Sequence, residues 1–132
     1  ETMPVAYIKT RQITGTNEVP GIFIIDSGAT VTLLPASDAK ALGLKLESGE
    51  KIFIRGITNN QLLGYRHSVS LIINGFTIRT VPVVFSKRDD TPRVLGREGV
   101  FTHFGIIFDE AKRRTGFLSE TNERKTIDSL FS

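Results

Sequence analysis

Short apolar runs, separated by turn-forming residues, recur along most of the chain. Such runs, rich in Val, Ile, Leu and Phe, are typical of half-buried or fully buried β-strands. The pattern predicts strands over Val5–Ile8, Val19–Ile25, Val31–Leu34, Ile52–Arg55, Leu62–Ile73, Phe76–Ile78, Val81–Phe85, Gly105–Asp109 and Thr115–Leu118. The chain is therefore expected to be mostly β.

Turn and helix signals complete this picture. Asn74-Gly75 predicts a tight hairpin turn, because both central positions of a type I′ turn need positive φ. Pro35–Gly43 predicts a short helix that begins near Pro and ends at Gly, and a second is expected over Glu123–Leu130. Gly56–Gln61 reads as a turn tip, and Pro82 predicts an edge or irregularity in its strand. Together these signals favour a compact, barrel-like, mostly β domain.

Length and composition narrow the class of protein. The 132 residues suffice for one domain, which we expect to span 1–132 with a core over about 5–118 and a C-terminal extension over 119–132. The absence of Cys excludes a disulfide framework, a thiolate metal site and a Cys nucleophile. It also fits a reducing compartment, so a cytoplasmic location is expected, while an anchor upstream of residue 1 stays open.

The charge pattern indicates no nucleic-acid or membrane partner. The net charge of +3 comes from 17 basic and 14 acidic residues that are scattered along the chain. The densest basic cluster, Lys112–Arg114, fits a solvated hairpin turn better than a binding face. No apolar run approaches the roughly 18–20 residues that a membrane-spanning helix needs.

Candidate chemistry appears where the apolar run Gly21–Ile25 meets Asp26-Ser27-Gly28-Ala29-Thr30. Asp26 supplies a carboxylate, Ser27 a short hydroxyl, and Gly28 allows close approach of another chain. Asp-Ser-Gly is also an ordinary turn composition. This turn, however, is bracketed by apolar segments, and a carboxylate delivered from the end of a buried strand is costly to desolvate without a partner or a chemical role.

One carboxylate cannot by itself supply both the base and the acid that peptide hydrolysis needs. Two close carboxylates that share one proton can supply both. The chain contains no second Asp-Ser/Thr-Gly. If Asp26 is catalytic, its partner must be Asp26 of another copy, in a homodimer with a two-fold axis through the site.

Three segments, in this order, resemble one family. Ile24–Thr30 fits its motif of two hydrophobic residues followed by Asp-Ser/Thr-Gly-Ala, Gly56-Ile57 falls in a long hairpin, and Val94–Arg97 fits two hydrophobic residues followed by Gly and Arg. From about Val5 to Phe117 the chain resembles the retropepsins, the single-domain, homodimeric aspartic proteases of retroviruses and their cellular relatives. The resemblance implies a retropepsin-like closed β-barrel, the acid protease fold, with one or two short helices.

The resemblance also implies roles for particular residues. Asp26 would be the shared general acid and base, Ser27 would lock the two active-site loops together across the dimer, and Gly28 would expose its carbonyl to bound peptide. Ala29 would line the site, and Ala29 and Thr30 would support the active-site loop. The flap that covers substrate would include Arg55, Gly56, Ile57 and Thr58. The second signature would be Leu95 beneath the loop, Gly96 at a tight strand crossing, and Arg97.

The chain departs from the viral members of the family at several places. An acid that often pairs with the signature Arg is replaced by Thr30, so we do not treat Arg97 as catalytic. The flap tip Thr58–Gln61 is polar, and Glu120–Ser132 extends past the point where the viral chains end. The dimer interface is therefore expected to be built differently.

We therefore expect an aspartic endopeptidase that is a homodimer, binds an extended polypeptide and needs no metal or other cofactor. A catalytically inactive dimerisation or peptide-binding module of the same fold is the alternative, and a basic nucleic-acid-binding barrel is a third. Asp109 is expected to be a turn residue, and His67 and His103 to have surface or packing roles, since neither His has metal-ligand spacing.

Overall fold

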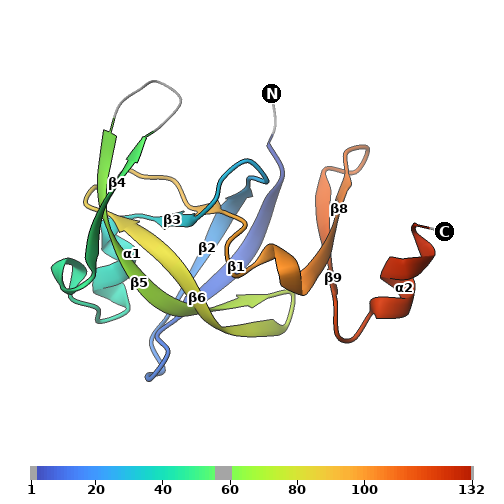
Figure 1. The fold of residues 1–132 in the computed structure, drawn as a ribbon, viewed down its shortest axis with the longest axis horizontal. Helices are drawn as coiled ribbons and strands as arrows, with labels where there is room; N and C mark the ends of the chain where they lie inside the picture. The colour runs from blue at the N-terminus through green and yellow to red at the C-terminus, as the bar shows by residue number, and fades with distance from the viewer. Residues whose placement is uncertain (1–2, 56–60, 132) are drawn as a thin grey trace.

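The computed structural model describes residues 3–55 and 61–131. Strands dominate these residues, which also contain two α-helices and two short 3₁₀ helices (Figure 1). In chain order the elements are β1 (Val5–Arg11), β2 (Glu18–Ile25), β3 (Thr32–Leu34), α1 (Ala36–Ala41), η1 (Leu46–Ser48), β4 (Glu50–Arg55), β5 (Gln61–Ile73), β6 (Phe76–Ser86), β7 (Val94–Leu95), η2 (Phe101–His103), β8 (Phe104–Asp109), β9 (Arg114–Ser119) and α2 (Arg124–Ser129).

The main sheet closes on itself. Its strand order is β1-β2-β7-β3-β6-β5-β4, with a further pairing between β1 and β5 that completes a ring. The long strand β5 makes this possible, because its first half, Gln61–Arg66, pairs with β4 and its last residues, Ser70–Ile73, pair with β1. In the pairing of β5 with β6, the register shifts between Val69 and Leu71, where the part of β5 that pairs with β1 begins. A bulge of this kind bends a strand, as closure requires.

The core fills the inside of this ring. Along β2, Phe23 and Ile25 are buried whereas Ile22 is exposed, as the two-residue period of a strand requires. The largest fully buried side chains are Phe23, Phe85, Ile8, Leu34, Leu42, Leu71, Ile73, Leu95, Val69, Val81, Val83 and Val84. They come from most strands of the main sheet and from Leu42 at the C-cap of α1, so one core holds together the strands that flank Asp26.

A second, two-stranded sheet lies beside the barrel. β8 and β9 form an antiparallel hairpin, which Figure 1 shows at one end of the molecule between the barrel and α2. Ile127 of α2 is buried, and it lies so close to Gly105 that a Cβ there would be 3.1 Å from it. No helix among the described residues is long and apolar enough to cross a membrane.

Most of the predicted elements are confirmed. Asn74 and Gly75 have φ values of 51° and 78°, as the type I′ turn requires, and Gly43 has a φ of 76° just beyond α1. Both helices fall inside their predicted ranges.

Two predictions were wrong. Gln61, expected in a turn tip, begins β5 and pairs with Arg55. The strands expected over Phe76–Ile78 and Val81–Phe85 are one continuous strand, β6.

Pro82 pairs with β5 only, since the pairing of β6 with β3 starts at Val83. A residue without an N–H is therefore accommodated in the middle of a long strand.

Candidate active site

Asp26 lies directly after β2, where the backbone is held on both sides. Ile25 stands opposite Leu95 of β7 in a parallel pairing, and the Asp26 N–H donates to the Leu95 carbonyl at 3.1 Å. The N–H of Ile25 donates to the carbonyl of Pro4 at 2.9 Å. The end of β2 is thus fixed between the N-terminal segment and β7, which sets the position of the carboxylate.

The loop after β2 folds back on the Asp26 side chain. Oδ1 of Asp26 accepts the N–H of Gly28 at 2.9 Å, and the carbonyl of Asp26 accepts the N–H of Ala29 at 3.1 Å. Asp26 and Ala29 are half-buried, whereas Ser27, Gly28 and Thr30 are exposed. No hydrogen bond or ion pair joins the Asp26 carboxylate to another side chain in the described part of the chain. The loop therefore holds an accessible carboxylate in a fixed direction.

The second signature crosses directly behind this loop. The N–H of Arg97 donates to the carbonyl of Ala29 at 3.0 Å, and the N–H of Glu98 to the carbonyl of Thr30 at 2.8 Å. A Cβ on Gly96 would lie 2.3 Å from the carbonyl oxygen of Val31, which real Cβ atoms do not tolerate. Gly is therefore the residue that allows this crossing.

The structure places the other predicted residues of this signature as follows. Leu95 is fully buried, and its carbonyl receives the Asp26 N–H, so it lies directly against the start of the Asp26 loop. Arg97 is exposed, and its side chain has no ion pair or hydrogen bond among residues 3–55 and 61–131. Arg97 thus holds the loop through its backbone.

The segment predicted to form the flap is only partly described. Arg55 is the last residue of β4, is exposed and pairs with Gln61. The predicted flap residues Gly56, Ile57 and Thr58 lie outside the described residues.

A partly buried ion pair near the site escaped the sequence analysis. Arg93 donates from Nε and Nη2 to both carboxylate oxygens of Asp38 in α1, at 2.7 and 2.9 Å. The Arg93 carbonyl also accepts the Ile24 N–H at 2.9 Å, two residues before Asp26. The hydrogen bond to Asp38 raises the pKa of Arg93, against the opposing effect of desolvation. The sequence signal that could have indicated this ion pair was the position of Asp38 in the first turn of a short helix rich in Ala.

The remaining candidates have structural roles. Asp109 forms an ion pair with Arg114 across the β8–β9 hairpin at 2.8 Å, and hydrogen bonding to that Arg lowers the pKa of Asp109 despite partial desolvation. Nε2 of His67 donates to the carbonyl of Leu46 at 2.8 Å, and the ring of His103 lies beside Phe76. In the described part of the chain, no cluster of three or more potential ligands could hold a metal ion.

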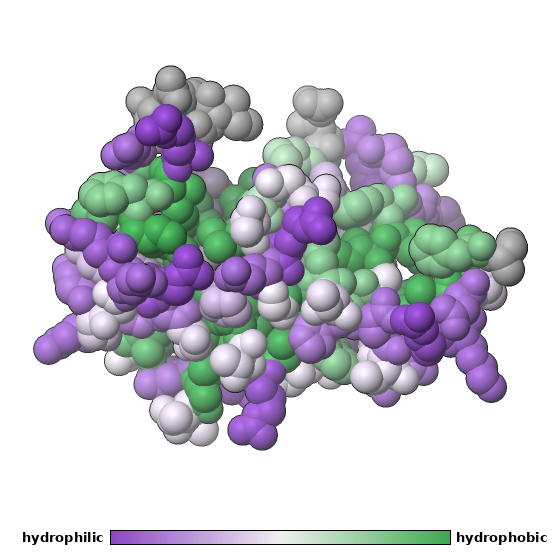
Figure 2. All heavy atoms as spheres, in the orientation of Figure 1, coloured by the Kyte–Doolittle hydropathy of each residue, from purple (hydrophilic) through white to green (hydrophobic). Residues whose placement is uncertain are grey.

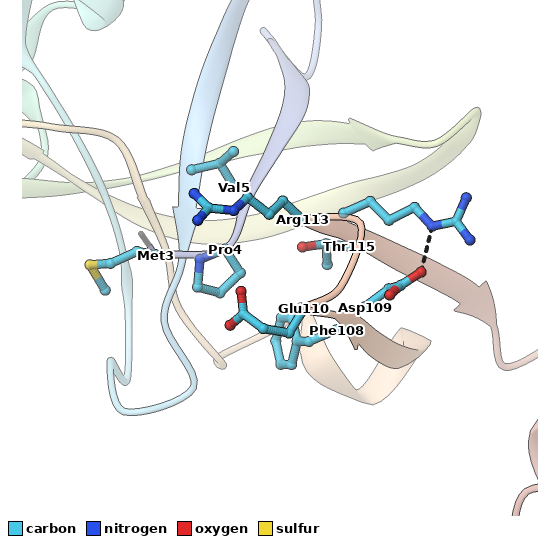
Figure 3. Close-up of a pocket in the computed structure, with 9 residues that line it drawn as sticks. Met3, Pro4, Val5, Phe108, Asp109, Glu110, Arg113 and Thr115 are labelled. Atoms are coloured by element: carbon cyan, nitrogen blue, oxygen red, sulfur yellow. Dashed lines mark hydrogen bonds and ion pairs between the residues drawn. The ribbon is translucent and has the colours of Figure 1, made fainter. Parts of the chain in front are cut away.

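A cavity of about 280 Å³ opens beside the segment that holds β2. Figure 3 shows Met3, Pro4 and Val5 facing Phe108 and the tip of the β8–β9 hairpin across it. Pro4 is the residue whose carbonyl receives the Ile25 N–H, so a residue lining the cavity is bonded to the end of β2, one residue before Asp26. Figure 2 shows apolar groups that reach the surface among charged groups. Among the residues that line the cavity, Met3, Val5 and Phe108 are large, apolar and exposed. Tyr7 and Ile22, which stand opposite each other on β1 and β2, are also exposed.

Comparison with known proteins places this geometry in a family. A retropepsin-like aspartic protease from Rickettsia conorii matches with a TM-score of 0.61 and 22% identity, over 80% of this chain and 85% of that one. EIAV protease complexed with the inhibitor HBY-793 matches with a TM-score of 0.54 and 20% identity, over 74% and 84%. These similarities show the retropepsin-like acid protease fold. No curated protein matches the chain. The family model described as "Aspartyl protease" matches residues 12–98, so the chain belongs to the aspartyl protease family.

Proposed function

We propose that this chain is an aspartic endopeptidase whose active site forms from Asp26 of two identical subunits. The observation that carries the proposal is the carboxylate of Asp26, accessible and held in a fixed direction by Gly28 and by the crossing behind its loop. The chain supplies one Asp-Ser-Gly. A two-fold axis beside the loop would place a second, equivalent carboxylate against the first.

Two carboxylates in direct contact would supply both the base and the acid that peptide hydrolysis needs. Like charges so close do not ionise together, so the pair holds one proton. The ionised carboxylate takes a proton from water as the water oxygen attacks the peptide carbonyl carbon. The protonated carboxyl donates a hydrogen bond to the carbonyl oxygen, where negative charge develops. Collapse of the tetrahedral intermediate breaks the C–N bond, and the leaving nitrogen takes a proton from the pair. Activity is therefore expected to fall once pH rises far enough to ionise both groups.

The surrounding residues have proposed roles that fit their positions. Ser27, which is exposed beside Asp26, would hydrogen-bond to the loop of the partner subunit. The exposed backbone at Gly28 would present its carbonyl to an extended peptide. The β4–β5 hairpin would lie over that peptide and form main-chain hydrogen bonds with it, while alternate side chains enter pockets on either side.

The cavity and the apolar residues beside Pro4 support a second copy of the chain as partner. Tyr7 and Ile22 stand opposite each other on neighbouring strands, and their side chains are 61% and 63% exposed. Exposed apolar groups gathered in this way are typical of interaction sites. Pro4, which lines the cavity, accepts the N–H of Ile25, the residue before Asp26. A copy bound at this surface would bring its own Asp26 loop toward the first.

Cleavage assays on two variants test the proposal. Asp26→Asn removes the ionisable group with almost no change in size, so we expect loss of peptide cleavage with folding and dimerisation retained. Asp89→Asn makes the same substitution at an exposed loop position and should cleave at the wild-type rate. A mixed peptide library should be cut by the wild type, and an inhibitor that mimics the tetrahedral intermediate should block the cutting.

The same assay identifies the alternative function. Binding of peptides without turnover by the wild-type protein would favour an inactive peptide-binding module. Undiminished cleavage by Asp26→Asn would contradict the proposed active site.

A further inference from the structure

Arg66 of β5 contacts two carboxylates on different parts of the chain. Its Nη1 donates to Oε1 of Glu98 at 3.3 Å, and its Nε lies 3.5 Å from Oε1 of Glu50. Glu50 stands directly opposite Arg66 on β4, at the base of the β4–β5 hairpin. Glu98 follows the second signature. One guanidinium therefore joins the base of the hairpin to the segment behind the active-site loop.

Glu98 is itself fixed to the active-site loop. Its N–H donates to the carbonyl of Thr30 at 2.8 Å, and the preceding residue, Arg97, donates to Ala29 at 3.0 Å. A continuous set of contacts thus runs from β5 through Arg66 and Glu98 to the loop that carries Asp26. A displacement of the base of the hairpin, at Glu50 and Arg66, relative to Asp26 strains or breaks this connection.

The ion pair between Arg66 and Glu98 is too exposed to add much to folding stability, so we assign it a role in orienting the hairpin. The side chains of Arg66 and Glu98 are 34% and 44% exposed, and ion pairs so open to water contribute little to folding stability. Several other pairs in the described part of the chain are local, such as Arg88–Asp90 and Arg124–Asp128. The Arg66–Glu98 pair instead connects residues 32 positions apart.

We propose that Arg66 and Glu98 are positioning residues that set the orientation of the β4–β5 hairpin relative to the Asp26 loop, and thereby the affinity for peptide. The inference rests on the proposed function, in which an extended peptide binds between hairpin and loop. Loss of the connection lets the hairpin sample more orientations, so more freedom is lost on binding. Neither residue touches the reacting atoms, so KM rises while kcat changes little.

Three neutral variants test the connection. Glu98→Gln and Arg66→Gln should each raise KM about two- to fivefold, the range expected for an exposed ion pair. Glu50→Gln is the matched control, because it removes the contact within the hairpin and leaves the contact with Glu98. The double variant Arg66→Gln/Glu98→Gln should show no more than the single effect, since both changes remove the same contact. Arg66→Lys keeps a cation and should restore part of the affinity.

A second measurement does not depend on cleavage. The chain contains no Cys, so spin labels can be attached specifically at Lys51→Cys on β4 and Thr102→Cys in η2, both of which are exposed. Labelled chains are diluted into a large excess of unlabelled chains, so that each measured distance lies within one subunit. Glu98→Gln should broaden the distribution of distances between the labels, and Glu50→Gln should leave it unchanged.

The two measurements separate this inference from the proposed function. A broadened distribution with Glu98→Gln supports the connection even in a protein that cleaves nothing, in which case the proposed function alone fails. Equal distributions of label distances in wild type and Glu98→Gln overturn the inference whether or not the protein is a protease. Additive effects of Arg66→Gln and Glu98→Gln on KM overturn it as well.

Discussion

The backbone N–H of Gly96 donates a hydrogen bond to Oγ1 of Thr32 at 3.0 Å, in the buried wall of the barrel. Thr32 begins β3 and Gly96 follows β7, so the bond joins the two strands on either side of the crossing. The Asp26 loop lies between β2 and β3 and is tied to β7 by its own backbone. A single buried hydroxyl thus helps to fix the loop that carries the candidate catalytic acid.

Thr32→Val tests this role with almost no change in side-chain size. Val cannot accept the Gly96 N–H, which is then buried without a partner, at a cost of about 1–3 kcal/mol. We expect this loss of unfolding free energy in urea denaturation, together with reduced cleavage. Thr30→Val, at an exposed position of the same loop, should leave the stability close to that of the wild type.

Gly96→Ala should be more damaging still. The added Cβ would lie 2.3 Å from the oxygen and 2.4 Å from the carbon of the Val31 carbonyl, and backbone cannot move aside as a flexible side chain can. We expect a loss of about 3 kcal/mol or more, or failure to fold, measured by the yield of folded protein and by urea denaturation. Gly116→Ala, whose Cβ would be 3.9 Å from its nearest neighbour, is the matched control. Equal stability of the two variants would contradict the tight crossing.

Asp38→Asn should destabilise the fold without touching the site. The Asp38 side chain is 4% exposed and that of Arg93 28%, so the substitution leaves a poorly hydrated guanidinium without its counter-charge. Removing one partner of a fully buried pair typically costs about 3–5 kcal/mol. Because Arg93 is partly open to water, we expect a smaller loss, about 1–3 kcal/mol, by urea denaturation. Asp89→Asn should show no such loss. A loss no greater than that of this control would mean that the pair contributes little.

The hairpin pair Asp109–Arg114 predicts a pH dependence. The pKa of Asp109 is lowered in the folded protein, chiefly by its hydrogen bond with Arg114. A lowered carboxyl pKa stabilises the folded hairpin above the unfolded pKa, about 4, and this contribution is lost as pH falls through the folded pKa. In an NMR titration, Arg114→Gln should raise the pKa of Asp109. An unchanged pKa would show that Arg114 is not its cause.

Local sequence signals were sufficient for many elements and for the position of Asp26 directly after a strand. The Asn74-Gly75 turn, the helix ending before Gly43 and the strand before Asp26 each depend on neighbouring residues, so the sequence pattern contains the information needed. The motif Asp26-Ser27-Gly28 was recognisable for the same reason.

Interactions between distant residues were not predictable in this way. Asp38 and Arg93 are 55 positions apart, and nothing in the segment around either residue indicates the other. The same holds for Arg66 and Glu98. β6 was divided into two strands because polar residues and Pro82 interrupt its apolar pattern, whereas tertiary pairing with β5 keeps it continuous. Register across a closed sheet depends on the whole fold.

The most direct test of the central claim mixes subunits. A fixed amount of wild-type chain is refolded from urea with an equal amount of Asp26→Asn chain, so that dimers form at random, and cleavage is compared with wild type refolded alone. If each active site needs Asp26 from both subunits, activity should fall to about half, because half of the wild-type chains enter inactive mixed dimers. Activity that stays unchanged on adding the variant would show that one chain works alone, and would contradict the shared site.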